Sequence, residues 1–314
     1  MGIIVFTLNI VAPIFLLILL GIFLERIGFV SRSFISQSSA FVFQVSLPAL
    51  IFLKIATVKI TKAFDPELIG VSLIVVLIIA AVGWVFSSFV TKAPQDKGVF
   101  IQGSFRSNFA IIGLALIANL LGDGELGRAS LVLAFVMPLY NILAVIALTV
   151  PFHKKKESDF GKIFKTIVTN PLILAAVIAA PFSIFKIPLG SIPTVTLTYL
   201  AKISLPLALV SIGASLNLKE LKKASRISFL AAFNKIVLFP LIAVAIGIYS
   251  GFDKHQLTIL FILFASPTAV ASFIMADAMG GNSKLASDII VVSTIFSVVT
   301  LSAGIIFLKY YGFM

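Results

Sequence analysis

Long apolar segments recur along the chain, and short polar connections separate them. A helix needs about 20 predominantly apolar residues to cross the hydrocarbon core of a bilayer. By this criterion the pattern predicts ten spans, over residues 3–25, 34–54, 67–91, 98–121, 127–150, 163–183, 194–217, 226–250, 256–279 and 285–308. We therefore predict an all-α integral membrane protein with ten transmembrane helices.

The amino-acid composition favours a membrane protein over a soluble one. Of the 314 residues, 60% are hydrophobic and 11% are charged, whereas a soluble domain carries about 25% charged residues. A soluble protein of this composition would expose large apolar patches and aggregate. The lipid bilayer is therefore the expected environment of most of the chain.

Positive charge is unevenly distributed among the connections. Five alternating connections, beginning with the first, carry 14 of the 24 Lys and Arg residues, while the other connections and both termini carry 7. The positive-inside rule then places loop 152–162 in the cytoplasm and both termini outside the plasma membrane. Membrane orientation accounts for the net charge of +12, so no nucleic acid partner is expected.

The two halves of the chain resemble each other at a fixed offset of 158 residues. The matching positions are Pro13 and Pro171, Ser46 to Pro48 and Ser204 to Pro206, Ala118 and Ala276, Asn119 and Asp277, and Gly122 and Gly280. Each half holds an odd number of spans, so the second half must insert upside down. We predict a first five-helix repeat over 1–151, a cytoplasmic linker over 152–162 and a second, inverted repeat over 163–314. Inverted repeats are typical of secondary transporters, which bind substrate near the midplane.

Two predicted spans carry residues that interrupt a helix. Pro267 lies near the middle of the ninth span, where proline removes a backbone hydrogen bond. The fourth span has no proline, but it gathers Ser104, Arg106, Ser107 and Asn108 within a few residues. Interrupted segments at equivalent places of two repeats indicate a transporter site. The N-terminal ends of the half-helices would favour a carboxylate there.

Polar side chains at membrane depth indicate the chemistry of such a site. Asn108 lies about 15 Å from the cytoplasmic end of its span, and its amide can donate to a carboxylate. Arg106 either draws anions to the site or extends to the inner interface, and the residues alone leave this open. Lys202 and Lys235 are expected to extend to an interface. Acidic residues and histidines are absent from the span centres, which favours an anionic substrate and leaves any coupling ion unassigned.

Segments in six spans, taken in order, carry a resemblance to a known family. They are Pro13 to Gly21, Ser46 to Phe52, Phe105 to Gly113, Asn170-Pro171, Pro206 to Leu216 and Ser266 to Val270. Through them the chain, over essentially its full length, resembles the auxin efflux carrier family. That family includes the plant PIN proteins and bacterial carriers of malate and malonate type.

The resemblance implies two inverted repeats with helices 4 and 9 broken and crossing, a fold similar to that of the bile acid:sodium symporters, and elevator-type transport of organic anions. The family's substrate-binding asparagine corresponds to Asn108 and its crossover proline to Pro267. Where the family often has Gly-x-Pro, this chain has Gly113-Leu114-Ala115, so the fourth span would break at Gly113 and its polar neighbours. The predicted substrate-binding residues are Ser46, Pro48, Arg106, Asn108, Phe109, Gly113, Ser204, Pro206, Ser266, Pro267 and Thr268.

Three other classes of membrane protein are alternatives to an anion carrier. A channel would need rings of pore-lining polar residues, and the sequence has no such series. The spans hold no catalytic histidine, cysteine or aspartate pair, and there is no phosphate-binding loop, so no enzyme activity, cofactor or metal is expected. A sodium-coupled symporter of the bile-acid type is the main alternative. The particular anion, the direction of transport and the oligomeric state, with a homodimer as one option, stay open.

Overall fold

The computed structural model describes residues 2–57, 64–152, 169–216 and 224–314. These residues form helices and connections, and no strand of a sheet occurs among them. Residues 153–162 of the predicted linker and 163–168 of the sixth predicted span lie outside the described residues. The helices are α1 (Ile3–Arg26), α2 (Arg32–Phe41), α3 (Leu47–Ala56), α5 (Pro66–Val90), α6 (Pro94–Phe105), α7 (Leu114–Leu121), α8 (Asp123–Thr149), α10 (Pro171–Ile184), α11 (Ser191–Ser215), α13 (Arg226–Phe233), α14 (Phe239–Tyr249), α15 (Lys254–Ala265), α16 (Ala271–Ala278) and α17 (Ser283–Tyr310).

Four short helical turns connect some of these helices. Three are π-helical: η1 (Val42–Ser46) joins α2 to α3, η2 (Phe109–Gly113) precedes α7, and η4 (Asn234–Leu238) joins α13 to α14. The fourth, η3 (Val150–Phe152), ends α8 as a 3-10 turn. Through η1 and η4 the flanking helices form continuous spans over 33–56 and 226–249. π-Helical turns of this kind occur mostly as single insertions, often at functional sites.

The prediction of an all-α integral membrane protein is confirmed. Seven helices within the described residues are long and apolar enough to cross a membrane, and three shorter apolar helices, over 109–121, 171–184 and 254–265, accompany them. The ends of the long helices lie within a few residues of the predicted span boundaries. The count of ten spans and the inverted repeat stay predictions.

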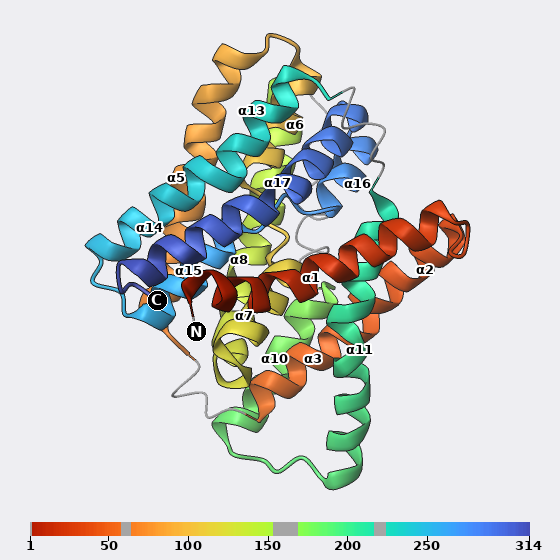
Figure 1. Ribbon diagram of the computed structural model, residues 1–314, viewed down its shortest axis with the longest axis vertical. Helices are drawn as coiled ribbons and strands as arrows, with labels where there is room; N and C mark the ends of the chain where they lie inside the picture. Colours follow the sequence, from red (N-terminus) through yellow and green to blue (C-terminus); the bar gives the residue numbers. More distant parts are fainter. Residues whose placement is uncertain (1, 58–63, 153–168, 217–223) are drawn as a thin grey trace.

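Two groups of helices make up the molecule (Figure 1). α5, α6, α8 and α13 to α17 gather on one side, and α2, α3, α10 and α11 gather on the other. α1 runs between the groups, and it packs against α11 from one and α17 from the other. The broken helices therefore lie mainly in the first group.

α1 and α11 approach each other closely at two glycines. A Cβ atom on Gly213 would lie 1.9 Å from the Ile18 carbonyl oxygen, and one on Gly21 would lie 2.1 Å from the Val210 carbonyl oxygen. Only a residue without a side chain fits at such a crossing, and small residues at helix interfaces are typical of membrane proteins. The two glycines thus set the distance between α1 and α11.

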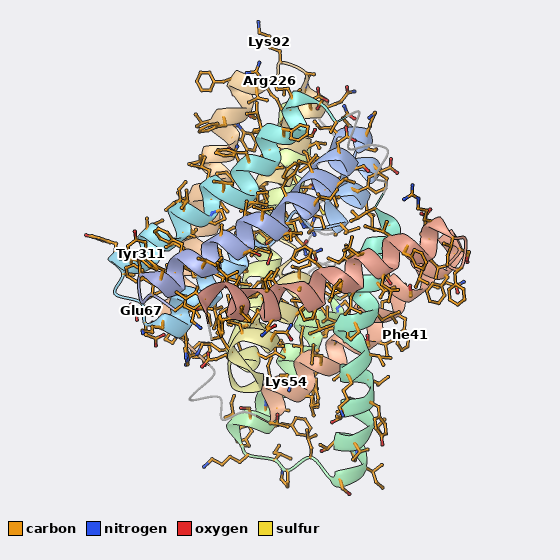
Figure 2. The ribbon with its side chains drawn as sticks, viewed as in Figure 1. Phe41, Lys54, Glu67, Lys92, Arg226 and Tyr311 are labelled. Carbon is orange, nitrogen blue, oxygen red and sulfur yellow. The ribbon has the colours of Figure 1, made fainter. Side chains whose placement is uncertain are left out.

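Large apolar side chains cover the outside of the molecule (Figure 2). Leu16 on α1, Phe89 on α5 and Ile192 on α11 are each more than half exposed. In water such a surface would drive aggregation. In a bilayer it faces lipid, which agrees with the membrane assignment.

Candidate functional site

The fourth predicted span is interrupted between α6 and η2. α6 ends at Phe105, and the helix resumes at Phe109. Arg106 has extended backbone angles (φ −75°, ψ 114°), and Asn108 has φ −82° and ψ 41°. The chain therefore leaves the helix for three residues in the part of the span where the polar residues cluster.

The ninth predicted span is interrupted between α15 and α16. α15 ends at Ala265, and α16 begins at Ala271. Ser266, directly before Pro267, is extended (φ −59°, ψ 139°), as expected because a proline ring disfavours helical angles in the preceding residue. Proline thus accounts for the break in this span.

The two interruptions meet and pair as a short antiparallel bridge between Ser107 and Thr268. The backbone N–H of Asn108 donates to the Pro267 carbonyl over 2.8 Å, and the N–H of Ala269 donates to the Arg106 carbonyl over 3.1 Å. These bonds satisfy backbone groups that the breaks leave without helical partners. The interruptions in the fourth and ninth predicted spans therefore lie against each other, and we call this contact the crossing.

Two hydroxyl groups cap the half-helices reciprocally at the crossing. Ser107 Oγ donates to the Leu263 carbonyl of α15 over 2.6 Å, and Thr268 Oγ1 donates to the Gly103 carbonyl of α6 over 2.7 Å. Each hydroxyl comes from one break and binds the last turn of the half-helix that ends at the other break. Ser293 of α17 accepts from the Thr268 N–H over 3.1 Å and ties the crossing to a third helix.

Arg106 is buried at the crossing, with 7% of its surface exposed. Its guanidinium donates to Asn141 Oδ1 of α8 over 2.8 Å and also to the Met275 sulfur of α16. Both partners are neutral. The Arg106 side chain is therefore enclosed between α8 and α16, and its part in a substrate site stays a prediction.

Lys235 corrects an expectation from the sequence. We expected its ammonium to reach an interface, but the side chain is completely buried, and Nζ donates to the Phe264 carbonyl in the last turn of α15. A cation near the C-terminal end of a helix interacts favourably with the helix dipole. The π-helical turn η4, which carries Lys235, packs against α15 and thereby presents this side chain to the crossing.

The Asn108 side chain makes no hydrogen bond with another described residue, and 6% of the surface of the residue is exposed. Gln102 of α6 is enclosed more fully: its Nε2 donates to the Ser272 carbonyl over 2.8 Å, but its Oε1 is buried and has no partner among the described residues. A buried polar atom without a partner is unfavourable, so Gln102 Oε1 calls for an explanation. An unpaired amide at the crossing is suited to a ligand.

The predicted site residues on the other helix group lie apart from the bonded network. Ser46 ends η1, Pro48 lies in the first turn of α3, and Ser204 and Pro206 lie within the unbroken helix α11. The Ser46 and Ser204 hydroxyls are buried, and neither has a partner among the described residues. α11 packs against both η1 and η2, which brings this group to the side of the crossing.

The place of the break in the fourth span also differs from the sequence expectation. Gly113 is the last residue of η2, so the helix has resumed before it, and the break falls at Arg106 to Asn108. A Cβ atom on Gly113 would lie 2.2 Å from the Phe109 ring. Gly113 therefore makes room for a fully buried aromatic ring instead of ending the helix.

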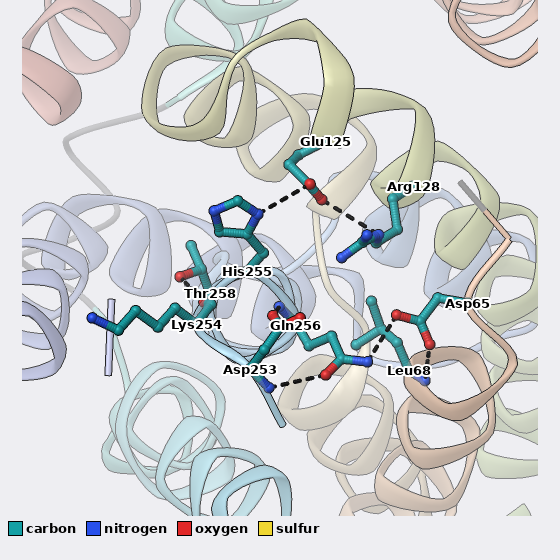
Figure 3. Close-up of polar contacts among 9 residues, drawn as sticks. All are labelled: Asp65, Leu68, Glu125, Arg128, Asp253, Lys254, His255, Gln256 and Thr258. Atoms are coloured by element: carbon teal, nitrogen blue, oxygen red, sulfur yellow. Dashed lines mark hydrogen bonds and ion pairs between the residues drawn. The ribbon is translucent and has the colours of Figure 1, made fainter. Parts of the chain in front are cut away.

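A polar cluster joins the N-terminal ends of three helices (Figure 3). Asp65, which caps α5, accepts from Gln256 Nε2 over 2.8 Å, and Glu125 of α8 contacts His255 over 3.1 Å and Arg128 over 3.4 Å. The N-termini of α5, α8 and α15 thus lie on the same side. At the N-termini of α6 and α17, Asn282 Nδ2 donates to Asp96 Oδ1 over 2.8 Å.

Sequence reasoning missed several partners of the crossing. The sequence pattern did not predict the roles of Gln102, Asn141, Ser293 and Met275. A polar amide within a predicted span, such as Asn141, indicates a functional position and could have been used to find this partner. No group of three or more metal-ligating His, Asp or Glu side chains occurs in the described part of the chain.

The fold and the crossing define a helical membrane protein with paired broken helices, and comparison with known proteins identifies its family. The family model described as "Membrane transport protein" matches residues 6–165 and 159–305. The chain therefore belongs to this family of transporters, the auxin efflux carrier family that the sequence resembled.

Relatives along the whole chain are also named as transporters. An "Uncharacterized transporter" of Methanothermobacter thermautotrophicus is 23% identical over 93% of this chain and 95% of its own. A protein of Rhizobium meliloti named "Putative malonate transporter" is 27% identical over 96% of this chain and 95% of its own. The "Uncharacterized transporter YfdV" of Escherichia coli is 25% identical over 92% of this chain and 93% of its own.

Proposed function

We propose that the protein is a secondary active carrier of small organic anions, which bind at the crossing of the fourth and ninth spans. The observation that carries the proposal is the paired break itself. Within it, the Asn108 backbone N–H donates to the Pro267 carbonyl, and the Asn108 side-chain amide has no partner among the described residues. Half-helix ends around a discontinuous segment are how many carriers build a substrate site within the membrane.

Charge at the crossing supports an anionic substrate. Arg106 and Lys235 bring two basic side chains into a buried region, and their partners there are an amide oxygen, a sulfur and a backbone carbonyl. None of these partners carries a full negative charge. Because a buried charge is costly unless it is compensated, a bound carboxylate would find a favourable potential at this place.

Asn108 is the residue that we propose binds the substrate carboxylate directly. It lies at the N-terminal end of η2, where free N–H groups and the helix dipole favour an anion. Its unpaired amide can donate to the same carboxylate. Phe109, Gly113, Ser266, Pro267 and Thr268 shape the site around it, and we assign Ser46, Pro48, Ser204 and Pro206 to its wall on the other helix group.

We further propose that the chain has ten spans in two inverted repeats and works as an elevator. The reciprocal pattern of the two breaks, in which each hydroxyl caps the other half-helix, is what two related and inverted repeats would produce. The polar cluster that joins the N-termini of α5, α8 and α15 agrees with three connections predicted on the extracellular side. The helix group that carries the breaks would then move against α1 and the group of α2, α3, α10 and α11.

Substrate exchange in proteoliposomes tests this function. Vesicles preloaded with an unlabelled carboxylate, such as malonate or malate, should take up the labelled acid by saturable counterflow. The name of the Rhizobium meliloti relative makes malonate the first acid to test. Uptake that needs a sodium gradient would instead support the bile-acid-type symporter, and ohmic currents would support a channel. Uptake of cations or neutral solutes with no uptake of any carboxylate would overturn the proposal.

A further inference from the structure

An apolar groove runs between the span formed by α13, η4 and α14 and the neighbouring helix α17, away from the crossing. Its volume is about 410 Å³, within the range of about 300–1,000 Å³ that is typical of ligand sites. Its walls include Phe229, Phe233 and Ile236 from one span and Val292, Phe296 and Thr300 from α17. The lining is almost wholly apolar, so the groove does not suit a water-soluble anion.

The groove opens to the outer surface of the protein. Phe229, Phe233 and Phe296 are 41%, 53% and 45% exposed, and the rings of Phe229 and Phe296 meet edge to face at 6.2 Å between the two helices. In a membrane this surface faces hydrocarbon. The natural occupant of an apolar hollow at this place is therefore an acyl chain.

A cation lies at one end of the groove. Arg226, the first residue of α13, lines it together with the apolar side chains, and it is exposed. Arg226 makes no ion pair or hydrogen bond with another described residue. Val237, which lines the groove farther along the span, lies eleven residues beyond Arg226, or about 16 Å at 1.5 Å per residue.

A cationic end and an apolar groove of this length match the two parts of a phospholipid. We propose that this groove binds one anionic phospholipid, with the phosphate at Arg226 and an acyl chain along Phe233 and Ile236. The N-terminus of α13 adds free N–H groups, because the Ser225 hydroxyl satisfies only the Ser228 N–H. The predicted orientation places this end in the cytoplasmic leaflet, which carries anionic lipids.

The lipid would contact the segment that supports the crossing. Ile236 and Val237 belong to η4, and they directly follow Lys235, whose ammonium caps α15. A lipid in the groove therefore packs against the same π-helical turn that presents Lys235. A bound lipid would act on the stability of this turn. The lipid proposal therefore does not depend on which substrate the protein carries.

Native mass spectrometry of the detergent-purified protein tests the proposal. We expect one phosphatidylglycerol molecule to remain bound and to be preferred over phosphatidylcholine. Arg226→Gln should weaken phosphatidylglycerol binding about tenfold, the lower end of what a hydrogen bond to a charged group contributes. Lys92→Gln is the matched control, because Lys92 is an exposed cation at the same end of the molecule (Figure 2) that does not line the groove.

A second variant tests the groove itself. Thr300→Phe fills the hollow without touching the cation, and we expect it to reduce binding of both lipids. Soluble glycerol phosphate should not compete at millimolar concentration, because it lacks the acyl chain. Equal retention of both lipids by the wild type, an unchanged preference in Arg226→Gln, full binding in Thr300→Phe or competition by glycerol phosphate would each overturn the proposal.

Discussion

The backbone N–H of Asn108 lies 2.8 Å from the carbonyl oxygen of Pro267. This bond joins the break in the fourth predicted span to the break in the ninth, and it occupies the Asn108 backbone while leaving the side-chain amide without a partner among the described residues. The same residue thus holds the crossing together through its main chain, and its side chain stays available for the carboxylate that we propose.

The reciprocal caps of Ser107 and Thr268 should stabilise the crossing jointly. We expect Ser107→Ala and Thr268→Val each to lower the free energy of unfolding by about 1 kcal/mol, because each leaves a half-helix carbonyl unpaired. The double variant should deviate from additivity by at least about 0.5 kcal/mol, since both hydroxyls serve one joint. Thermal unfolding in detergent measures this. Thr198→Val, which removes a hydroxyl hydrogen bond within α11, is the control for the loss of a hydroxyl. Additive losses of stability in the Ser107→Ala, Thr268→Val double variant would show that the two caps act separately.

Lys235 should contribute to anion affinity from a distance. Lys235→Met removes a buried basic group from the region of the crossing, and we expect the KM of anion uptake to rise about tenfold through the lost electrostatic attraction. Lys202→Met is the matched control, because Lys202 is exposed on α11. Uptake kinetics in proteoliposomes measure both variants. An unchanged KM in Lys235→Met would restrict Lys235 to a structural role at the end of α15.

The close crossing of α1 and α11 should not tolerate a methyl group. Gly213→Ala places a Cβ against the Ile18 backbone, and we expect a loss of about 1–3 kcal/mol as the helices move apart. Gly70→Ala is the control, since a Cβ there meets nothing within 4 Å. Because alanine has a better helix propensity than glycine, Gly70→Ala should leave the free energy of unfolding unchanged or raise it by up to about 1 kcal/mol. Equal melting temperatures for the two variants would contradict the observed packing.

The orientation in the membrane can be tested directly, because the chain has no cysteine. Lys254→Cys places a thiol in the connection predicted to lie outside, and Ser158→Cys places one in the predicted cytoplasmic loop. A membrane-impermeant maleimide should label Lys254→Cys in intact cells and Ser158→Cys only after permeabilisation. The reverse pattern would invert the topology derived from the positive charges.

The sequence predicted those features that depend on local chemistry. Span length and apolar composition located the long helices, because a bilayer requires about 20 apolar residues. Pro267 located the break in the ninth span for a local reason as well, since a proline restricts the residue before it. The cluster from Ser104 to Asn108 indicated the fourth span, but not the residue at which its helix ends.

Other features depend on contacts between segments that are distant in the chain, and a single sequence does not reveal such contacts. Lys235 was expected at an interface, and only the packing of η4 against α15 explains its bond to Phe264. Gly113 was expected at a break, whereas it gives room to the ring of Phe109. The partners of Arg106, Asn141 and Met275, come from other spans, so spacing along the chain could not identify them.

Binding of an organic anion at Asn108 is tested most directly by thermal stabilisation of the purified protein. A ligand that binds only the native state raises apparent stability, by about 2.7 kcal/mol at one hundred times its Kd. We expect one class of carboxylic acid to raise the melting temperature of the wild type and of Asn9→Ala, an exposed amide control on α1, and to have no effect on Asn108→Ala. No shift with any organic anion at millimolar concentration, or an equal shift in Asn108→Ala, would contradict an anion site at this crossing.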